Sequence, residues 1–341
     1  MEFKLNNFDV LRLLAAYQVL IGHTLSHFGL SEVPLFGYFP GVPIFFAISG
    51  FLISASWERS QTLSGYFKNR FLRIYPALWF CFLLSVFVVS LTYDFRVFSV
   101  DFLKWSLAQL TIGQFYNPDF FRDYGVGVVN GSLWTIPVEL QFYLSIPIIY
   151  LIMNKLRWSN LIFSCVIVLF SVINYYKYQY QVAYGESLFF KLFAVTVIPY
   201  LNMFLFGVLL QKNLHLVERF LANKVFVWLG FYVLSIVLTE IVGARNAGNA
   251  INPASAFMLT LLIISAAYSH VDKFSNILKG NDISYGVYIY HMIFINLLLS
   301  LNLFSSMINA ALVILVTTIV ATLSWRFLEK PALSLKTVKL R

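Results

Sequence analysis

Charged residues are scarce in this chain of 341 residues: Asp, Glu, Lys and Arg make up 11% of it, whereas hydrophobic residues make up 60%. Soluble globular domains are about a quarter charged, and a water-soluble fold of this composition would leave much of its surface apolar. The apolar stretches recur along the whole length, which argues against one very large soluble core. The composition therefore predicts an all-α polytopic integral membrane protein.

Cysteine is also rare, and the usual ligand clusters are missing. Cys81 and Cys165 both fall inside apolar segments, which favours small buried side chains over a disulfide or a metal pair. His23 and His27 have no further ligands nearby, so no metal site is predicted. The net charge of +9 comes without a compact Lys/Arg block, so it indicates membrane orientation rather than a nucleic-acid partner.

Long apolar segments, in contrast, are abundant. A helix needs roughly 20 apolar residues to cross a hydrocarbon core about 30 Å thick. This criterion predicts about ten transmembrane helices, at residues 8–28, 38–57, 75–93, 132–153, 158–174, 188–210, 224–242, 253–270, 283–303 and 307–328. The shorter, charged segment 98–116 is predicted to be interfacial or re-entrant. No repeat or low-complexity linker divides the chain, so residues 1–341 are predicted to form a single domain.

The basic residues predict how these spans are oriented. With the N-terminus in the cytoplasm, most of the 24 Lys and Arg residues fall in cytoplasmic segments, including Lys4, Arg157 and the C-terminal group KTVKLR. The opposite side keeps only a few, such as Arg96 and Arg245. Cytoplasmic N- and C-termini, with an even number of spans, fit this bias.

The first apolar segment carries ionisable residues, which are rare at membrane depth and usually face a bundle interior or a water-filled cavity. Arg12 and His23 are separated by three helical turns plus about 20°, so they project from one face roughly 16 Å apart along the axis. A snorkelling arginine and a histidine bonded to a neighbouring helix explain either residue alone. Their shared face favours a functional pair. His27, one turn further, is interpreted as a packing or rim residue.

Two further motifs bring small residues and arginines to the membrane. In GVPIFFAISGFLI, Ser49 and Gly50 permit close approach of a ligand or a second backbone, and helix packing is the simpler interpretation. In FKNRFLRIYPALW, Arg70 and Arg73 form a pair on one side of a helical turn and suit phosphate groups through bidentate hydrogen bonds. Orientation charge and lipid headgroup contact are the alternative for this pair.

The motif GSLWTIPVELQFY places Glu139 about a third of the way into the fourth span. Ser132 lies seven residues earlier, nearly on the same face of a continuous helix, and Pro137 can kink that helix and open local space. A buried carboxylate needs a proton, a partner or water, and His23 is the expected partner.

The ninth span reads ISYGVYIYH and places Ser284, Tyr288 and His291 on one side of a helix, at spacings of four and three. A functional role is weighed here against a set of buried side chains that satisfy one another.

Six motifs in this order, namely LRLLAAYQVLIGH, GVPIFFAISGFLI, FKNRFLRIYPALW, GSLWTIPVELQFY, ISYGVYIYH and FLEKP, resemble the membrane-bound acyltransferase-3 family over essentially the whole chain. The resemblance implies about ten membrane helices and transfer of an acyl group, most often acetyl, to extracytoplasmic acceptors. Such acceptors are sugar hydroxyls of lipopolysaccharide O-antigen, exopolysaccharide or peptidoglycan. The chain resembles the stand-alone form of the family, without a fused periplasmic hydrolase-like domain.

The resemblance also assigns roles to residues. The family's Arg-x10-His pattern falls on Arg12 and His23, its Arg-x-x-Arg pattern on Arg70 and Arg73, and its acidic position on Glu139. Acetyl-CoA is the expected donor, with no metal involved. The arginines would hold the phosphates and arm of coenzyme A, and His23 would act as general base beside Glu139 or as a covalent acyl carrier.

Other candidates for the site are Ser49 and Gly50 on the donor side, together with Ser132, Trp134, Tyr288 and His291. The expected partners are a glycan or lipid-linked glycan acceptor and membrane lipid, and the expected location is the bacterial cytoplasmic (inner) membrane. Segments 94–131 and 174–187 are expected to select the acceptor through their aromatic and amide side chains. A transporter or flippase of an anionic or lipid-linked substrate is the alternative function, with Arg, His and Glu forming a permeation path or proton relay.

Overall fold

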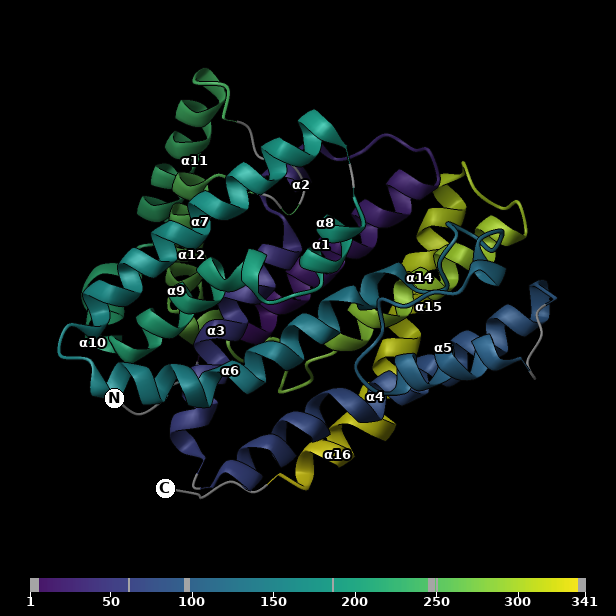
Figure 1. Cartoon of the computed structure of the whole chain (residues 1–341), viewed down its shortest axis with the longest axis horizontal. Coiled ribbons are helices and arrows are strands. Elements are labelled where there is room, and N and C mark those ends of the chain that lie inside the picture. The colour runs from purple at the N-terminus through teal and green to yellow at the C-terminus, as the bar shows by residue number, and fades with distance from the viewer. Residues whose placement is uncertain are drawn as a thin grey trace. The chain divides into compact units, whose positions relative to one another are not determined.

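The computed structural model describes residues 6–60, 62–94, 99–185, 187–244, 249 and 251–336, and within these ranges it contains helices and no strands (Figure 1). The longer helices are α1 (Phe8–His27), α3 (Gly41–Arg59), α4 (Leu63–Thr92), α5 (Val100–Leu110), α6 (Thr135–Lys155), α7 (Ser159–Tyr184), α9 (Leu201–Lys212), α11 (Val225–Ile241), α12 (Pro253–Ala267), α14 (Ser284–Ser300) and α15 (Met307–Ser324). The shorter elements are α2 (Pro34–Tyr38), α8 (Leu188–Ala194), α10 (Leu214–Leu216), α13 (Val271–Phe274) and α16 (Lys330–Ser334), the 3-10 helices η1 (Asp119–Phe121), η2 (Gly131–Trp134) and η3 (Ile198–Tyr200), and the π-helices η4 (Val217–Leu221) and η5 (Trp325–Glu329). The predicted all-α class is confirmed for the described residues.

Several of these helices are suited to cross a membrane. By length and composition, five helices in the described ranges qualify: Pro34–Arg59, Leu63–Thr92, Gly131–Lys155, Ser159–Gln181 and Met307–Ser334. The number rises to seven if two bent pairs each count as one span. The apolar helices α12 and α14 have 15 and 17 residues, short of a full crossing. The chain is a multi-pass membrane protein, and the count of ten stays a prediction.

The bent pairs differ from the straight spans that the sequence predicts. The first joins Leu188–Ala194 to Ile198–Lys212 at 57°, with Pro199 at the start of the second piece, where a residue without an N–H costs no helical hydrogen bond. The second joins Leu214–Leu221 to Val225–Ile241 at 87°. Of the basic residues on which the predicted orientation depends, Lys4, Arg96, Arg245 and residues 337–341 lie outside the described ranges.

The helices gather in two compact units, which we describe separately. Unit 1 comprises Met1–Ala15, Pro34–Ser60 and Gln141–Gly280. Unit 2 comprises Ala16–Val33, Gln61–Leu140 and Asn281–Arg341.

Within unit 1, α3 and α9 pack backbone against backbone. A Cβ atom built on Gly50 would lie 2.0 Å from the carbonyl oxygen of Phe204, and one on Gly207 would lie 2.3 Å from that of Ala47. Both positions therefore require glycine. Gly50 takes part in helix packing, the simpler of the two interpretations that its sequence motif left open.

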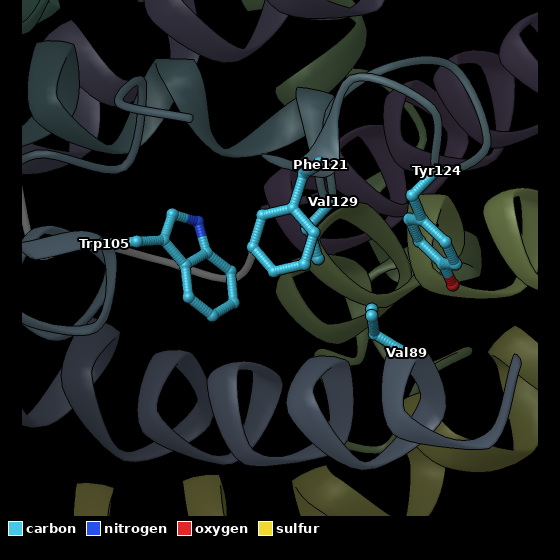
Figure 2. Close-up of a cluster of buried hydrophobic side chains, with 5 residues drawn as sticks. All are labelled: Val89, Trp105, Phe121, Tyr124 and Val129. Carbon is cyan, nitrogen blue, oxygen red and sulfur yellow. The ribbon is translucent and has the colours of Figure 1, made fainter. Parts of the chain in front are cut away.

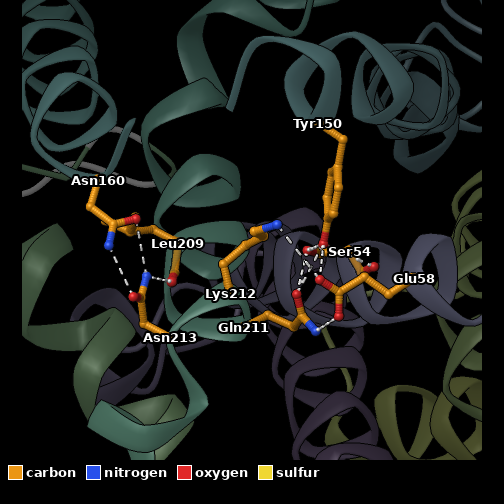
Figure 3. A network of polar contacts seen from close by, with 8 residues as sticks. All are labelled: Ser54, Glu58, Tyr150, Asn160, Leu209, Gln211, Lys212 and Asn213. Carbon is orange, nitrogen blue, oxygen red and sulfur yellow. Dashed lines mark hydrogen bonds and ion pairs between the residues drawn. The ribbon is translucent and has the colours of Figure 1, made fainter. Parts of the chain in front are cut away.

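A network of polar side chains also connects α3, α6 and α9 in unit 1, and the sequence patterns did not reveal it (Figure 3). The Tyr150 hydroxyl bonds Ser54 Oγ at 2.7 Å and donates to Glu58 Oε1 at 3.0 Å. Gln211 Nε2 donates to Glu58 Oε2 at 2.7 Å, and Lys212 Nζ lies 4.5 Å from the centre of the Tyr150 ring. Each helix thus satisfies polar groups of the other two, as an apolar environment requires.

In unit 2, three aromatic side chains of segment 99–131 are buried in a hydrophobic cluster. Trp105, Phe121 and Tyr124 are at most 2% exposed and cluster with Val89 of α4 and with Val129 (Figure 2). Burial of such large rings stabilises the segment against α4. Within the segment predicted to be interfacial or re-entrant, Val100–Leu110 form helix α5, which Ser99 caps by accepting a hydrogen bond from Phe102 N.

Amide side chains that contact this segment, from α14 and from the segment itself, are also buried. Asn296 of α14 donates to the carbonyls of Val128 and Val129 at 2.9 Å each and accepts from Val126 N at 3.0 Å. Gln109 and Gln114 bond backbone carbonyls inside the segment. These side chains are therefore engaged within the protein, and acceptor selection by segment 94–131 stays a prediction. The second expected loop, 174–187, is mostly helix, since α7 continues to Tyr184.

Candidate active site

Two histidines from distant parts of the chain meet in unit 2. His23 Nδ1, on α1, lies 2.9 Å from His291 Nε2, on α14, and the ring centroids are 5.2 Å apart. His291 is fully buried, whereas His23 is half-buried. The sequence predicted Glu139 as the partner of His23, but in the structure His23 Nδ1 is hydrogen-bonded to His291. The two residues are 268 positions apart, so helical spacing carries no signal for this contact.

The environment of this pair differs on its two sides. On α1, the ring of His27 is 5.9 Å from that of His23, and His27 is exposed, as expected for a rim residue. On α14, the ring of Tyr288 is 6.1 Å from that of His291. The His23–His291 pair thus has the protein interior on the side of His291 and the exposed His27 on the side of His23.

Ser132 and Tyr288, both predicted site residues, belong to one hydrogen-bond network. The Tyr288 hydroxyl donates to Ser132 O at 3.1 Å and accepts from Thr135 Oγ1 at 3.0 Å. Ser132 Oγ donates its single proton to Asn130 Oδ1 at 2.7 Å, and the carbonyl oxygen of Tyr288 lies 3.2 Å away. Ser132 is thereby occupied in joining η2 to α14. Thr135 and Asn130 were missed by the sequence patterns, since neither stands at a recurring spacing.

Asn130 also illustrates how tightly η2 is held. Its Nδ2 donates to the carbonyl of Ile289 at 2.7 Å and its Oδ1 accepts from Ser132 N at 3.3 Å. The residue is 9% exposed, so the Asn-Gly-Ser glycosylation pattern there is not accessible.

Two geometric expectations for this region are wrong. Ser132 and Glu139 do not follow one continuous α-helix, because residues Gly131–Trp134 form the 3-10 helix η2 and α6 begins at Thr135. A 3-10 helix has three residues per turn, so counting at 100° per residue fails there. Pro137 lies in the first turn of α6, where its missing N–H costs no helical hydrogen bond and needs no kink.

Glu139 itself is half-buried on α6. Its carboxylate is close enough to act electrostatically on the phenols of Tyr66, Tyr285 and Tyr288. Glu139 is therefore near Tyr288, whose ring is 6.1 Å from that of His291. Trp134, another predicted site residue, is half-buried in η2. Their roles in catalysis stay predictions.

The arginine pair lies inside helix α4 rather than in a loop, because α4 begins at Leu63 and continues through Pro76. Arg73 Nη2 forms an ion pair with Asp282 Oδ2 at 2.5 Å. Asp282 Oδ1 in turn accepts hydrogen bonds from the backbone N–H and the hydroxyl of Ser284 at the start of α14. The partner of Arg73 was missed, although an acidic residue ahead of an apolar run is a common helix-start signal.

Arg70 is half-buried one turn earlier, and its charge acts on Tyr66, the same buried phenol that Glu139 reaches. The remaining predicted residues on the donor side, Arg12, Ser49 and Gly50, belong to unit 1. Arg12 shares α1 with His23 and is half-buried, as is Ser49.

The two cysteines lie in different environments. Cys81 is buried, as predicted, and its thiol donates to Ile289 O at 3.3 Å. Cys165 is exposed on α7, so the prediction of a buried side chain is wrong there. Among the residues with described positions, no group of three or more His, Cys, Asp or Glu side chains is arranged to hold a metal ion.

Comparison with known proteins assigns this arrangement to a family. A family model described as an acyltransferase domain matches residues 5–326. The chain belongs to the acyltransferase-3 family. It is an O-acyltransferase, since family relatives are named O-acetyltransferases. The resemblance that the sequence motifs indicated is confirmed.

The relatives of this acyltransferase differ in how much of it they cover. Nodulation protein 10 of Rhizobium leguminosarum bv. viciae is 30% identical over 355 residues, which span 97% of this chain and 94% of that protein. The O-acetyl transferase of Shigella phage Sf6 is 36% identical over 148 residues, 41% of this chain and 44% of that protein. The peptidoglycan O-acetyltransferase OatA of Listeria monocytogenes is 30% identical over 162 residues, 43% of this chain and 24% of that protein. No solved structure matches the acyltransferase.

Proposed function

We propose that this acyltransferase moves an acetyl group from acetyl-CoA to a hydroxyl group of an extracytoplasmic glycan. The observation that carries the proposal is the half-buried His23, held through Nδ1 by the buried His291 beside an exposed His27. A neutral imidazole held in this way has a lone pair that can take a proton from a hydroxyl group, which suits general-base catalysis. The names of two relatives, an O-acetyl transferase and a peptidoglycan O-acetyltransferase, support an acetyl group and a glycan.

A single base, His23, is enough to balance the protons of this reaction. The acceptor hydroxyl oxygen attacks the thioester carbonyl carbon while His23 takes the hydroxyl proton. The tetrahedral intermediate then collapses, the carbon–sulfur bond breaks, and the proton passes from His23 to the departing thiolate. The products are an O-acetyl ester and free coenzyme A. In the alternative that the sequence leaves open, His23 first takes the acetyl group itself and then passes it to the hydroxyl.

The donor side of the proposal rests on positively charged residues. Arg12 stands eleven residues before His23 on α1, roughly 16 Å along the axis, a length that suits the extended arm between the phosphates and the thioester of coenzyme A. Arg70 would bind the phosphates, since a guanidinium group binds phosphate oxygens with two hydrogen bonds. Arg73, one turn away on α4, is paired with Asp282 and would act through its positive charge. Glu139 would stabilise the imidazolium that forms on His23. We place the reaction at a bacterial cytoplasmic membrane, where a cytoplasmic donor and an external acceptor meet.

Acetyl transfer by the purified protein tests this function. The protein in detergent is incubated with acetyl-CoA labelled in the acetyl group and with candidate glycans, and labelled glycan and free thiol are measured together. We expect both to rise with the wild-type protein and to fall to background with His23→Ala. The matched control is His27→Ala, one turn away on the same helix, which should keep most of the activity.

Two results would overturn the proposal. Full transfer by a folded His23→Ala variant would remove His23 from the chemistry. Absence of transfer in detergent, together with substrate movement across a sealed membrane, would favour the transporter or flippase instead. A comparison by mass spectrometry of surface glycans from cells with and without the gene identifies the acceptor.

A further inference from the structure

We propose that His291 is a positioning residue that fixes the tautomer of His23, so that His23 carries its proton on Nδ1 and presents Nε2 to the acceptor hydroxyl. This inference rests on the proposed function for its chemistry, but the tautomer itself is a property of the resting protein.

The first argument comes from the shared hydrogen bond. His23 Nδ1 and His291 Nε2 are 2.9 Å apart, the normal length of a hydrogen bond that contains one proton. Two cationic rings at this distance would repel each other, and His291 is fully buried, which penalises a charge further. The resting pair therefore consists of two neutral imidazoles that share a single N–H···N bond.

The second argument decides which ring donates. The other nitrogen of His291, Nδ1, is buried and forms no regular hydrogen bond. His23 Nδ1 is taken up by His291, so Nε2 is the nitrogen of His23 that is left for the acceptor. A general base needs its lone pair on that nitrogen, which puts the proton of neutral His23 on Nδ1. His23 Nδ1 is then the donor of the shared bond and His291 Nε2 its acceptor.

The chemical consequence follows at the second nitrogen of His23. With the proton on Nδ1, the lone pair of neutral His23 is on Nε2, which is the atom able to take the hydroxyl proton or, in the covalent alternative, the acetyl group. When Nε2 gains its proton, the positive charge spreads toward His291 through the N–H···N bond, which strengthens because its donor is now charged. His291 touches neither donor nor acceptor and acts only through His23.

Two substitutions of His291 distinguish a role in orienting His23 from a role in packing. In His291→Gln, the side-chain oxygen reaches the position of Nε2 and still accepts from His23 Nδ1–H, whereas His291→Leu fills the space without an acceptor. We expect the leucine variant to lose roughly a hundredfold in kcat, the scale of misoriented catalytic groups, with the KM for acetyl-CoA unchanged. The glutamine variant should retain kcat within about tenfold. Met292→Leu, at the neighbouring buried position, is the packing control and should behave as wild type.

Nitrogen-15 NMR of the purified protein labelled at histidine observes the tautomer directly. Comparison of the wild-type protein with His23→Ala assigns the His23 signals, and we expect a protonated Nδ1 and an unprotonated Nε2. In His291→Leu, the fraction of His23 that carries its proton on Nδ1 should fall. This measurement needs no turnover, so it tests the tautomer of His23 independently of activity. A failure to find acetyl transfer would count against the proposed function alone.

Three outcomes would overturn the inference. One is a resting His23 with its proton on Nε2. Another is a folded His291→Leu variant with wild-type kcat. The third is a folded His291→Gln variant as inactive as His291→Leu, because an acceptor at the Nε2 position would then not suffice.

Discussion

Arg73 of α4 and Asp282, directly before α14, form an ion pair in which Nη2 and Oδ2 are 2.5 Å apart and the side chains are 13% and 7% exposed. A pair this well shielded behaves differently from a surface pair. Its attraction is strong, but removal of one partner leaves a charge in an apolar environment.

Asp282→Ala should therefore destabilise the protein by about 3–5 kcal/mol, since Arg73 loses its carboxylate. The matched control is Asp101→Ala, which removes the exposed pair of Asp101 and Lys104, whose side chains are 59% and 61% exposed. Exposed pairs contribute about 0–1 kcal/mol. Thermal unfolding in detergent measures both, and equal effects of the two substitutions would contradict the buried pair.

Arg70→Gln should raise the KM for acetyl-CoA about ten- to a hundredfold and leave kcat nearly unchanged, because in the proposed function its guanidinium binds phosphates far from the reacting thioester. The loss of one charge-assisted contact corresponds to about 1.5–3 kcal/mol. Steady-state kinetics at varied acetyl-CoA concentration provide the measurement. Arg219→Gln, at an exposed position of η4, serves as the charge-matched control. An unchanged KM in Arg70→Gln would remove Arg70 from the donor site.

Gly50→Ala should destabilise unit 1 by about 1–3 kcal/mol, because the new Cβ would lie 2.0 Å from the Phe204 carbonyl oxygen and force α3 and α9 apart. Gly230→Ala is the same substitution in helix α11, where a Cβ meets no atom within 4 Å. That variant should gain about 0.5–1 kcal/mol from helix propensity. The two changes in unfolding temperature should have opposite signs, and a neutral Gly50→Ala would show that the helices are not in backbone contact.

Asn296→Leu should release segment 111–131 from α14. The substitution strands the two carbonyls and one N–H that Asn296 now satisfies, and each stranded buried group costs about 1–3 kcal/mol. Limited proteolysis, with cleavage sites mapped by mass spectrometry, should show faster cutting within this segment. Ser90→Ala, which removes a hydrogen bond to Phe87 O within helix α4 at an exposed position, should be cut at the wild-type rate. Unchanged proteolysis in Asn296→Leu would refute the anchoring role.

Tyr150→Phe should loosen the polar network of α3, α6 and α9. It removes the hydroxyl that bonds the buried Ser54 and the exposed Glu58. Both residues keep Gln211 as a partner, so we expect the loss of an ordinary hydrogen bond, about 0.5–1.5 kcal/mol. Tyr176→Phe makes the same change where the side chain is 66% exposed and should be neutral. Unfolding temperatures in detergent compare the two, and equal values would show that the network contributes no stability.

Much of the membrane architecture was predictable from the chain alone. Composition and apolar runs predict helices and membrane crossing, because a backbone in lipid must satisfy its own hydrogen bonds and helices do so locally. The motif order indicated the family, and helical spacing placed Arg12 and His23 on one face. The positions where local counting failed are those where the backbone leaves α-helical geometry, as at the 3-10 helix containing Ser132 and at the bend before Pro199.

Which side chains meet was decided only by the tertiary structure. His23 lies against His291, Arg73 against Asp282 and Asn296 against segment 126–129, across sequence separations of 167 to 268 residues. No periodicity spans such distances, because each contact depends on how whole helices pack. The sequence thus determined the helices, their membrane character and the catalytic candidates. The packing of α14 against its neighbours decided that His23 has an imidazole partner rather than the expected carboxylate, since a buried helix satisfies its polar groups with whatever lies beside it.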